Sequence, residues 1–187
     1  TAAHCVWLED EDFDILKRHG VTVACCPASN LKLASGYANV PKMLESGINV
    51  ALGTDGAASN NNLNIMQDMY LFGVVYKGYF RDPTIITPAE VLHAATRAGA
   101  LSQGRDDSGL LAVGMRADLC VLNTDTPQFT PMTSAACNVV YAAQGADIRM
   151  TMVDGEILYR DGEFKTIDIE KVKAEVQRRT DSILSRL

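Results

Sequence analysis

The sequence has no apolar run approaching the roughly 20 residues that a membrane-spanning helix needs. It also lacks a basic segment followed by an apolar one at its start, the pattern of a secretory signal. Positive charge is limited, because 17 Lys and Arg against 23 Asp and Glu give a formal net charge of -6. We therefore expect a soluble cytoplasmic protein with no nucleic-acid partner and no membrane partner.

Paired cysteines are also lacking. The five cysteines are odd in number, and Cys25 and Cys26 are adjacent, which does not suggest a disulfide framework. No CxxC pair is present to suggest a zinc cluster. We expect reduced thiols that pack in the core.

The chain is too short for a complete eight-stranded α/β barrel with an added domain, since it has 187 residues. It begins at Thr1, directly in a strand-like apolar run with no lead-in. We therefore expect a fragment whose N-terminal part is missing.

The first 108 residues alternate short apolar runs with helical patterns, which is typical of βαβ units that form a parallel sheet. The expected strands are 1–6, 21–25 and 48–53. Helices around 12–17 and 41–44 separate them and end at Gly20 and Gly47. An amphipathic helix is expected over 63–80, and Thr87 caps another whose apolar stripe runs from 91 to 100.

The sequence pattern changes at Gly109, where short strand-like runs alternate with Gly, Asp and Pro turns. Strands are expected within 110–114, 117–123, 138–143 and 149–164, with a hairpin turn at Asp154-Gly155. Asp168 caps a last helix. Its apolar side chains face one way, namely Val172, Val176, Ile183, Leu184 and Leu187. We thus divide the chain into an α/β part (1–108), a small β part (109–165) and a C-terminal helix (166–187).

Two ionisable residues lie where the strands of the expected sheet end. His4 ends the first strand, and Asp55 comes just after the third. Because functional groups gather at the carboxyl ends of parallel strands, we expect these side chains to face one another. The alternative is that His4 is satisfied in the core and that Asp55 only caps the following helix.

Further polar residues fall on the same rim. Ser29 and Asn30 follow the second strand, and Ser59 follows Asp55 in a loop of small residues that leaves the carboxylate accessible. They either shape a pocket or only hold the loop by side-chain to backbone hydrogen bonds. The other two histidines, His19 and His93, lie within helical patterns and are expected to be structural.

Three ordered motifs, AAHCVWL, CPASNLKLASG and LGTDGAASNNNLN, resemble the amidohydrolase superfamily, and most of all its methylthioadenosine/S-adenosylhomocysteine deaminase branch. The later GLLAVGMRADLCVLN and TMVDGEILYRDGEF resemble that family's small β-sandwich. The resemblance implies the C-terminal part of a metal-dependent hydrolase (β/α)8 TIM barrel, with the visible strands as the sixth to eighth, plus part of the sandwich.

The resemblance also implies roles. Asp55 would bind one divalent metal, usually zinc, and take a proton from the attacking water, while His4 would act as its catalytic electrostatic partner. Asp55, Ser59 and Asn30 would bind the substrate, a purine nucleoside such as S-adenosylhomocysteine or 5'-methylthioadenosine, which loses ammonia. The family's His-x-His pair, a further metal-binding His and a nearby Glu are not in this sequence. The missing N-terminal half would supply them, so this fragment alone is expected to be inactive.

Several alternatives stay open. Relatives often carry His where Cys25 stands, and guanine deaminases and chlorotriazine hydrolases share the framework, so the substrate is not fixed. A reading from another class is a non-catalytic fragment or assembly module. A third is a module that binds a small molecule without turnover. A homo-oligomer is compatible with each of them.

Overall fold

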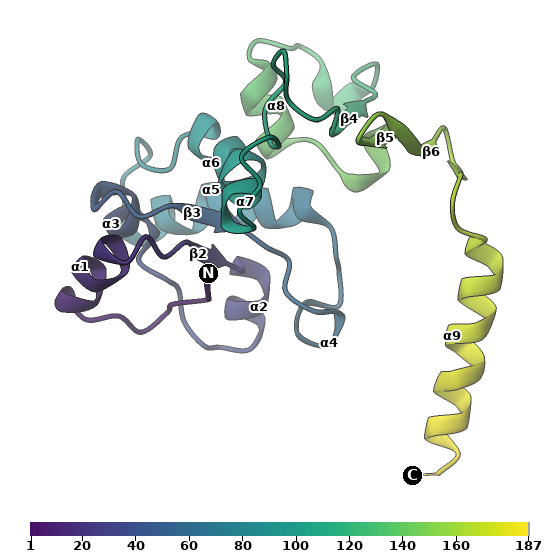
Figure 1. The fold of residues 1–187 in the computed structure, drawn as a ribbon, viewed down its shortest axis with the longest axis horizontal. Coiled ribbons are helices and arrows are strands. Elements are labelled where there is room, and N and C mark those ends of the chain that lie inside the picture. The colour runs from purple at the N-terminus through teal and green to yellow at the C-terminus, as the bar shows by residue number, and fades with distance from the viewer. Residues whose placement is uncertain (187) are drawn as a thin grey trace.

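The computed structural model describes residues 1–186 (Figure 1). Leu187, which we expected on the apolar stripe of the last helix, lies outside them. The elements are β1 (Ala2–Ala3), α1 (Asp10–Arg18), β2 (Val23–Cys25), α2 (Pro27–Lys32), α3 (Val40–Glu45), β3 (Val50–Leu52), α4 (Ala57–Asn60), α5 (Ile65–Phe80), α6 (Pro88–Ala95), α7 (Arg97–Ser102), β4 (Leu119–Leu122), η1 (Pro127–Phe129), α8 (Ala135–Tyr141), η2 (Gly145–Asp147), β5 (Ile148–Val153), β6 (Glu156–Arg160), β7 (Glu163–Phe164) and α9 (Ile169–Leu184).

The first sheet is parallel and has the order β1-β2-β3, as the alternation of apolar runs and helices predicted. Val23 pairs with Ala2 on one side and with Val50 on the other. Val23 and Val50 are almost fully buried, because helices cover the sheet and leave little of it to solvent. The sheet sits at the centre of the α/β part in Figure 1, with α1 and α3 near one end and α5 to α7 beside it.

The core of this part is one cluster of apolar side chains from the sheet and from the helices around it. Phe72 and Tyr76 of α5 are its largest fully buried members and meet edge to face, with ring centroids 5.7 Å apart. Cys25 is also fully buried, and its Sγ lies 3.4 Å from the Tyr76 hydroxyl. Burial raises the pKa of the Cys25 thiol to about 12, so this thiol packs as a neutral core group, as expected.

The helix boundaries follow local signals in the sequence. Gly20 and Gly47 have φ of 60° and 77° just after α1 and α3, which confirms them as left-handed helix ends. Thr87 and Glu90 form a capping box at the start of α6. The helical stripe expected over 91–100 is broken at Thr96, where α6 ends and α7 begins. The Thr96 hydroxyl donates to the Leu92 carbonyl at 2.6 Å.

The first strand is shorter than predicted. We expected it to run to residue 6, but it ends at Ala3 because His4 and Cys5 have φ of 64° and 47°. A left-handed residue cannot continue an extended strand. The segment after β2 was expected to be a loop, and it instead forms α2 with Pro27 at its first position.

The second sheet is antiparallel, with order β4-β5-β6-β7. The hairpin between β5 and β6 turns at Asp154 and Gly155, whose φ values of 51° and 83° suit a two-residue turn, as predicted. Two strand predictions in this region are wrong. Residues 110–114 form turns and bends, and 138–143 fall largely in α8.

Helix α8 forms despite the β-branched Val139 and Val140, because its position in the fold outweighs their strand preference. Ser134 caps the helix by accepting a hydrogen bond from the Cys137 amide. Val140 is 1% exposed and joins the core cluster beside α5 and α6. The chain thus crosses back to the α/β part before it enters β5.

Helix α9 stands clear of the rest of the chain at the right of Figure 1. Asp168 caps it as predicted, by accepting from the Lys171 amide at 3.0 Å. None of its described residues is buried. Within residues 1–186, no helix has both the length and the apolarity that crossing a membrane requires.

Candidate active site

His4 and Asp55 lie side by side at the carboxyl end of the parallel sheet, as their places in the sequence predicted. Nε2 of His4 is 3.8 Å from Oδ2 of Asp55. This is too long for a direct hydrogen bond, so the two groups are neighbours rather than partners. Their side chains are 39% and 27% exposed, which leaves both accessible from outside.

Both residues have left-handed backbones, with φ of 64° at His4 and 63° at Asp55. This conformation is uncommon for residues other than glycine and is found disproportionately at functional sites. The surrounding structure holds it in place, because the His4 amide donates to the Ala24 carbonyl at 2.9 Å and the Gly53 amide donates to the Cys25 carbonyl at 2.9 Å. The sheet ladder thus fixes the backbone on which each side chain sits.

The Asp55 carboxylate is oriented by hydrogen bonds to both of its oxygens. Ser29 donates its hydroxyl to Oδ2 at 2.6 Å, and the Gly56 amide donates to Oδ1 at 2.7 Å. These bonds, together with His4 and the Ser59 hydroxyl, hold the pKa of Asp55 below its usual value. Asp55 is therefore an anion at neutral pH, as a metal ligand or a proton acceptor must be.

The His4 ring is oriented by Asn30. Nδ1 of His4 lies 2.8 Å from Oδ1 of Asn30, and because an amide oxygen can only accept, Nδ1 carries the proton. In the neutral ring this leaves Nε2 as an acceptor that faces Asp55. Asn30 is 3% exposed, and its Nδ2 has no hydrogen-bond partner among the described residues.

The remaining candidates fall as follows. Ser29 is buried and hydrogen-bonds to Asp55. Ser59 lies on α4, partly exposed beside the same carboxylate. His93 lies in α6 and His19 caps α1, so neither joins the pair. Cys25, the departure from the family pattern, turns toward Tyr76 in the core and does not face His4 or Asp55.

One residue that sequence reasoning missed lies directly beneath this site. Asp68 of α5 is fully buried and accepts hydrogen bonds from Ala28 of α2, which precedes Ser29, and from Asn60 of α4, which follows the Asp55 loop. A signal for it exists, because Asp68 precedes Phe72 by four residues and Tyr76 by eight, which puts it on the buried face of the helix. A carboxylate on an apolar stripe needs a polar partner, and that need could have marked it.

The site offers two metal-ligand types, a carboxylate and an imidazole, and they suit a divalent metal in kind. They do not suffice in number, since residues 1–186 contain no group of three His, Cys, Asp or Glu side chains able to hold a metal ion. A catalytic zinc normally has at least three protein ligands. Asp55 and His4 therefore form at most one part of a metal site.

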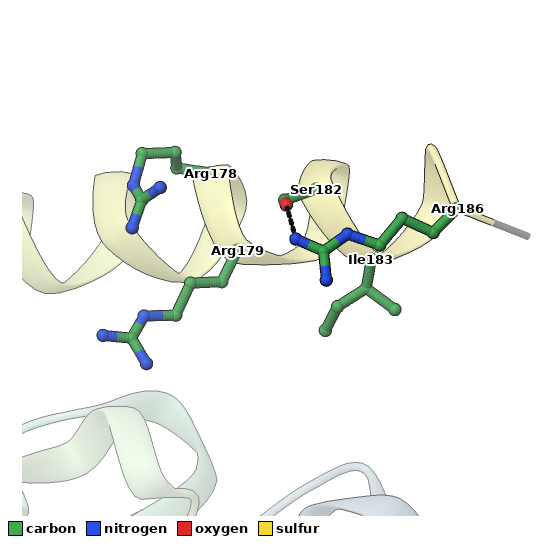
Figure 2. Close-up of a pocket in the computed structure, with 5 residues that line it drawn as sticks. All are labelled: Arg178, Arg179, Ser182, Ile183 and Arg186. Carbon is green, nitrogen blue, oxygen red and sulfur yellow. Dashed lines mark hydrogen bonds between the residues drawn. The ribbon is translucent and has the colours of Figure 1, made fainter.

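A hollow of about 380 Å³ lies elsewhere, along α9 (Figure 2). Three arginines, Arg178, Arg179 and Arg186, line it together with Ser182 and Ile183. Arg178 and Arg179 are paired with the Glu175 carboxylate, whereas Arg186 donates to the neutral hydroxyl of Ser182. Nothing in this hollow resembles the chemistry at His4 and Asp55.

Comparison with known proteins gives a consistent result. Residues 1–158 match the amidohydrolase family. The chain is 43% identical to a 5'-deoxyadenosine deaminase of Methanosarcina mazei and 46% identical to a 5-methylthioadenosine/S-adenosylhomocysteine deaminase of Acetivibrio thermocellus. These alignments cover 100% and 98% of this chain but 43% of each relative, so the chain spans less than half of their length.

Solved structures agree in fold. An adenosine deaminase from Xanthomonas campestris with bound zinc has a TM-score of 0.95 at 30% identity, over 98% of this chain and 42% of that one. An atrazine chlorohydrolase from Arthrobacter aurescens, complexed with zinc, has a TM-score of 0.86 at 27% identity, over 94% and 39%. The mixed α/β architecture and the sequence motifs are thus those of this family, as the resemblance indicated. The chain belongs to the amidohydrolase family.

Proposed function

We propose that the intact enzyme to which this chain contributes removes ammonia hydrolytically from an adenosine-type purine, S-adenosylhomocysteine or 5'-methylthioadenosine. The observation that carries the proposal is the His4–Asp55 pair, which the sheet ends hold 3.8 Å apart. It occurs in a chain whose curated relatives are named as deaminases of 5'-deoxyadenosine and of 5-methylthioadenosine and S-adenosylhomocysteine.

The choice of an adenosine-type substrate rests on degree of similarity. The deaminase relatives are 40–46% identical over nearly the whole chain, whereas the triazine hydrolases are 27% identical. A chlorotriazine hydrolase is therefore the weaker reading, and a guanine deaminase stays the alternative on which these identities do not bear. Cys25 no longer argues for either, because its side chain is fully buried and away from the pair.

We further propose that β1, β2 and β3 are the sixth to eighth strands of a (β/α)8 barrel. Within the described residues, β1 and β3 each pair on one side only. Closing a barrel would pair both free edges with strands of the missing N-terminal half. Residues 1–108 would then be barrel, 109–165 part of a β-sandwich and 166–187 a C-terminal helix.

In this proposal Asp55 is one ligand of a single zinc ion, and the missing half supplies the other ligands. The ion, when bound, makes a water molecule acidic enough to provide hydroxide near neutral pH. The hydrogen bonds from Ser29 and Gly56 keep the Asp55 carboxylate ionised and aimed at the site. They also leave lone pairs on both oxygens for a ligand or a proton.

Residues of this chain then carry out and assist the proton transfers. Asp55 accepts the proton of the water that attacks the amino-bearing ring carbon, and it returns a proton to the departing amine. His4, its tautomer set by Asn30, presents Nε2 to the same space and steadies the attacking water by accepting a hydrogen bond from it. Ser59 and Asn30 border the purine. In this proposal Asn30 acts mainly through His4, since its side chain is nearly inaccessible.

The test compares Asp55→Ala with Asp14→Asn in the full-length enzyme. We expect ammonia release from 5'-methylthioadenosine to fall by roughly 10³-fold or more for Asp55→Ala, because it removes both a ligand and a proton acceptor. Asp14, an exposed residue of α1, should tolerate its change. Activity retained by Asp55→Ala would refute the proposal.

The competing readings make different predictions for the unmodified protein. A module that binds without turnover would take up the purine nucleoside and release no ammonia, even with zinc supplied. An assembly module would bind neither zinc nor nucleoside, with or without its partner. Metal-dependent ammonia release that appears only when both halves are present would exclude both.

A further inference from the structure

A buried carboxylate lies beneath the candidate site. Asp68, in the first turn of α5, has no solvent exposure, and its buried neighbours on the helix are Met69, Phe72 and Tyr76. Burying a carboxylate costs several kcal/mol unless hydrogen bonds compensate. Hydrogen bonds to Asp68 must therefore compensate for its burial, and each of its two oxygens accepts one.

The first partner leads to Asp55 through α2. Oδ1 of Asp68 accepts from the Ala28 amide at 3.1 Å. Ala28 lies in the first turn of α2, where amides have no partner within the helix, and the N-cap residue Cys26 makes no side-chain cap. The Asp68 carboxylate, which belongs to α5, thus caps the first turn of α2. The next residue is Ser29, whose hydroxyl donates to Asp55.

The second partner leads to Asp55 through the loop after β3. Oδ2 of Asp68 accepts from Nδ2 of Asn60 at 3.0 Å. The same Nδ2 donates to the carbonyl of Thr54 at 2.8 Å, and Thr54 directly precedes Asp55. One buried carboxylate therefore reaches the catalytic candidate from both sides, once through Ser29 and once through Thr54.

From this geometry we propose that Asp68 is a positioning residue, which holds the Ser29 and Thr54 segments so that the Asp55 carboxylate faces His4. The inference rests on the proposed function, because it takes Asp55 as the metal ligand and proton acceptor. It also accounts for the left-handed Asp55 backbone: φ of 63° is sustained by a loop whose ends, Thr54 and Asn60, are joined by the Asn60 side chain, which in turn bonds Asp68.

The chemistry of the contact makes Asp68→Asn a sharp probe. Both partners of Asp68 are donors, so only a group with two acceptor oxygens satisfies them. Asparagine has nearly the same shape but turns an NH₂ toward either Ala28 or Asn60. One of the two connections is then lost, and two donors face each other in a buried space.

The experiment measures zinc affinity by chelator competition, kcat and KM for 5'-methylthioadenosine, and melting temperature, all on the full-length enzyme. Phe72→Leu is the matched control, because Phe72 is equally buried on α5 and its apolar side chain takes part in neither hydrogen-bond connection. We expect Asp68→Asn to lower zinc affinity and kcat about 10- to 100-fold with little change in KM. Phe72→Leu should lower the melting temperature and leave zinc affinity and kcat near wild type.

Equal zinc affinity and kcat in the two variants, or losses that only follow their melting temperatures, would overturn the inference. Asn60→Ala covers the case in which Asp68→Asn does not fold, since it removes one connection and leaves the buried carboxylate bonded to Ala28. It should lose zinc affinity in the same direction but less, and wild-type affinity would again overturn the inference.

Failure of the proposed function gives a separate result. A wild-type enzyme that binds zinc and releases no ammonia from adenosine-type substrates would refute the deaminase activity. The zinc affinities of Asp68→Asn, Asn60→Ala and Phe72→Leu would still decide whether Asp68 positions Asp55.

Discussion

Helices α5 and α9 are both 16 residues long and both start at a side-chain cap, Asn64 in one and Asp168 in the other. Their surroundings are opposite. Helix α5 buries Asp68, Met69, Phe72, Gly73 and Tyr76, whereas none of the described residues of α9 is buried. Apolar spacing and caps thus predict where a helix forms, but only tertiary packing decides what its apolar face contacts and whether the helix adds to stability.

The largest difference between the two helices should appear when an apolar side chain is truncated in each. We expect Phe72→Ala to reduce the free energy of unfolding by about 3–5 kcal/mol, because Phe72 is fully buried and its removal leaves a cavity. Val176→Ala in α9 should change it by no more than about 0.5 kcal/mol, since Val176 is 58% exposed. Denaturant unfolding of both variants measures the two values. A cost above about 1 kcal/mol for Val176→Ala would show that this face of α9 is covered in the folded protein.

A smaller difference is expected between caps. Thr87→Ala removes the capping box of α6, a helix that packs Val91 and Ala94 into the core, and should cost about 1 kcal/mol. Asp168→Ala removes a similar bond at the start of α9, which can fray without exposing any core. Its cost to global unfolding should be near zero, although amide exchange in the first turn of α9 should quicken. Equal losses of unfolding free energy in Thr87→Ala and Asp168→Ala would contradict the expectation that α6 is coupled to the core and α9 is not.

The sequence predicts most clearly where a local rule acts alone. The capping box at Thr87, the cap at Asp168 and the turn at Asp154-Gly155 each depend on neighbouring residues only, and all three are confirmed. The prediction failed at 138–143, where β-branched residues favour a strand and packing of Val140 against α5 and α6 imposes a helix. It also failed after Ala3, because the left-handed turn at His4 leaves no mark in the sequence.

The candidate site divides in the same way. The proximity of His4 and Asp55 follows from parallel topology and was predictable, although their catalytic roles and the substrate contacts of Ser59 and Asn30 stay predictions. The bond from Ser29 to Asp55, the bond between Asn30 and His4, and the ties from Asp68 were not predictable. Each joins residues from different elements, and only the packing of those elements brings the partners within reach.

The smallest effect expected is electrostatic and confined to α9. Hydrogen bonds from Arg178 and Arg179 lower the pKa of Glu175 from 4.5 to about 2. A carboxyl whose pKa is lower in the folded helix stabilises that helix above pH 4.5, and the contribution is lost as pH falls from 4.5 toward 2. Because these side chains are exposed, the effect should be slight and should weaken with added salt.

Residue-resolved NMR of α9 between pH 5 and 2 measures this loss, with α5 as the internal reference. We expect the helical shifts around Glu175 to decline over that range in the wild type, and those of Phe72 and Tyr76 to hold for as long as the core stays folded. Glu175→Gln should remove most of the pH dependence near residue 175, since the titrating group is gone. An unchanged decline in that variant would show that the Glu175 ion pairs are not its cause and would point to the other ion pair of α9, between Glu170 and Lys173. Helix α9 would then depend on its charges collectively rather than on one pair of arginines, whereas the stability of α5 would still come from its packing in the core.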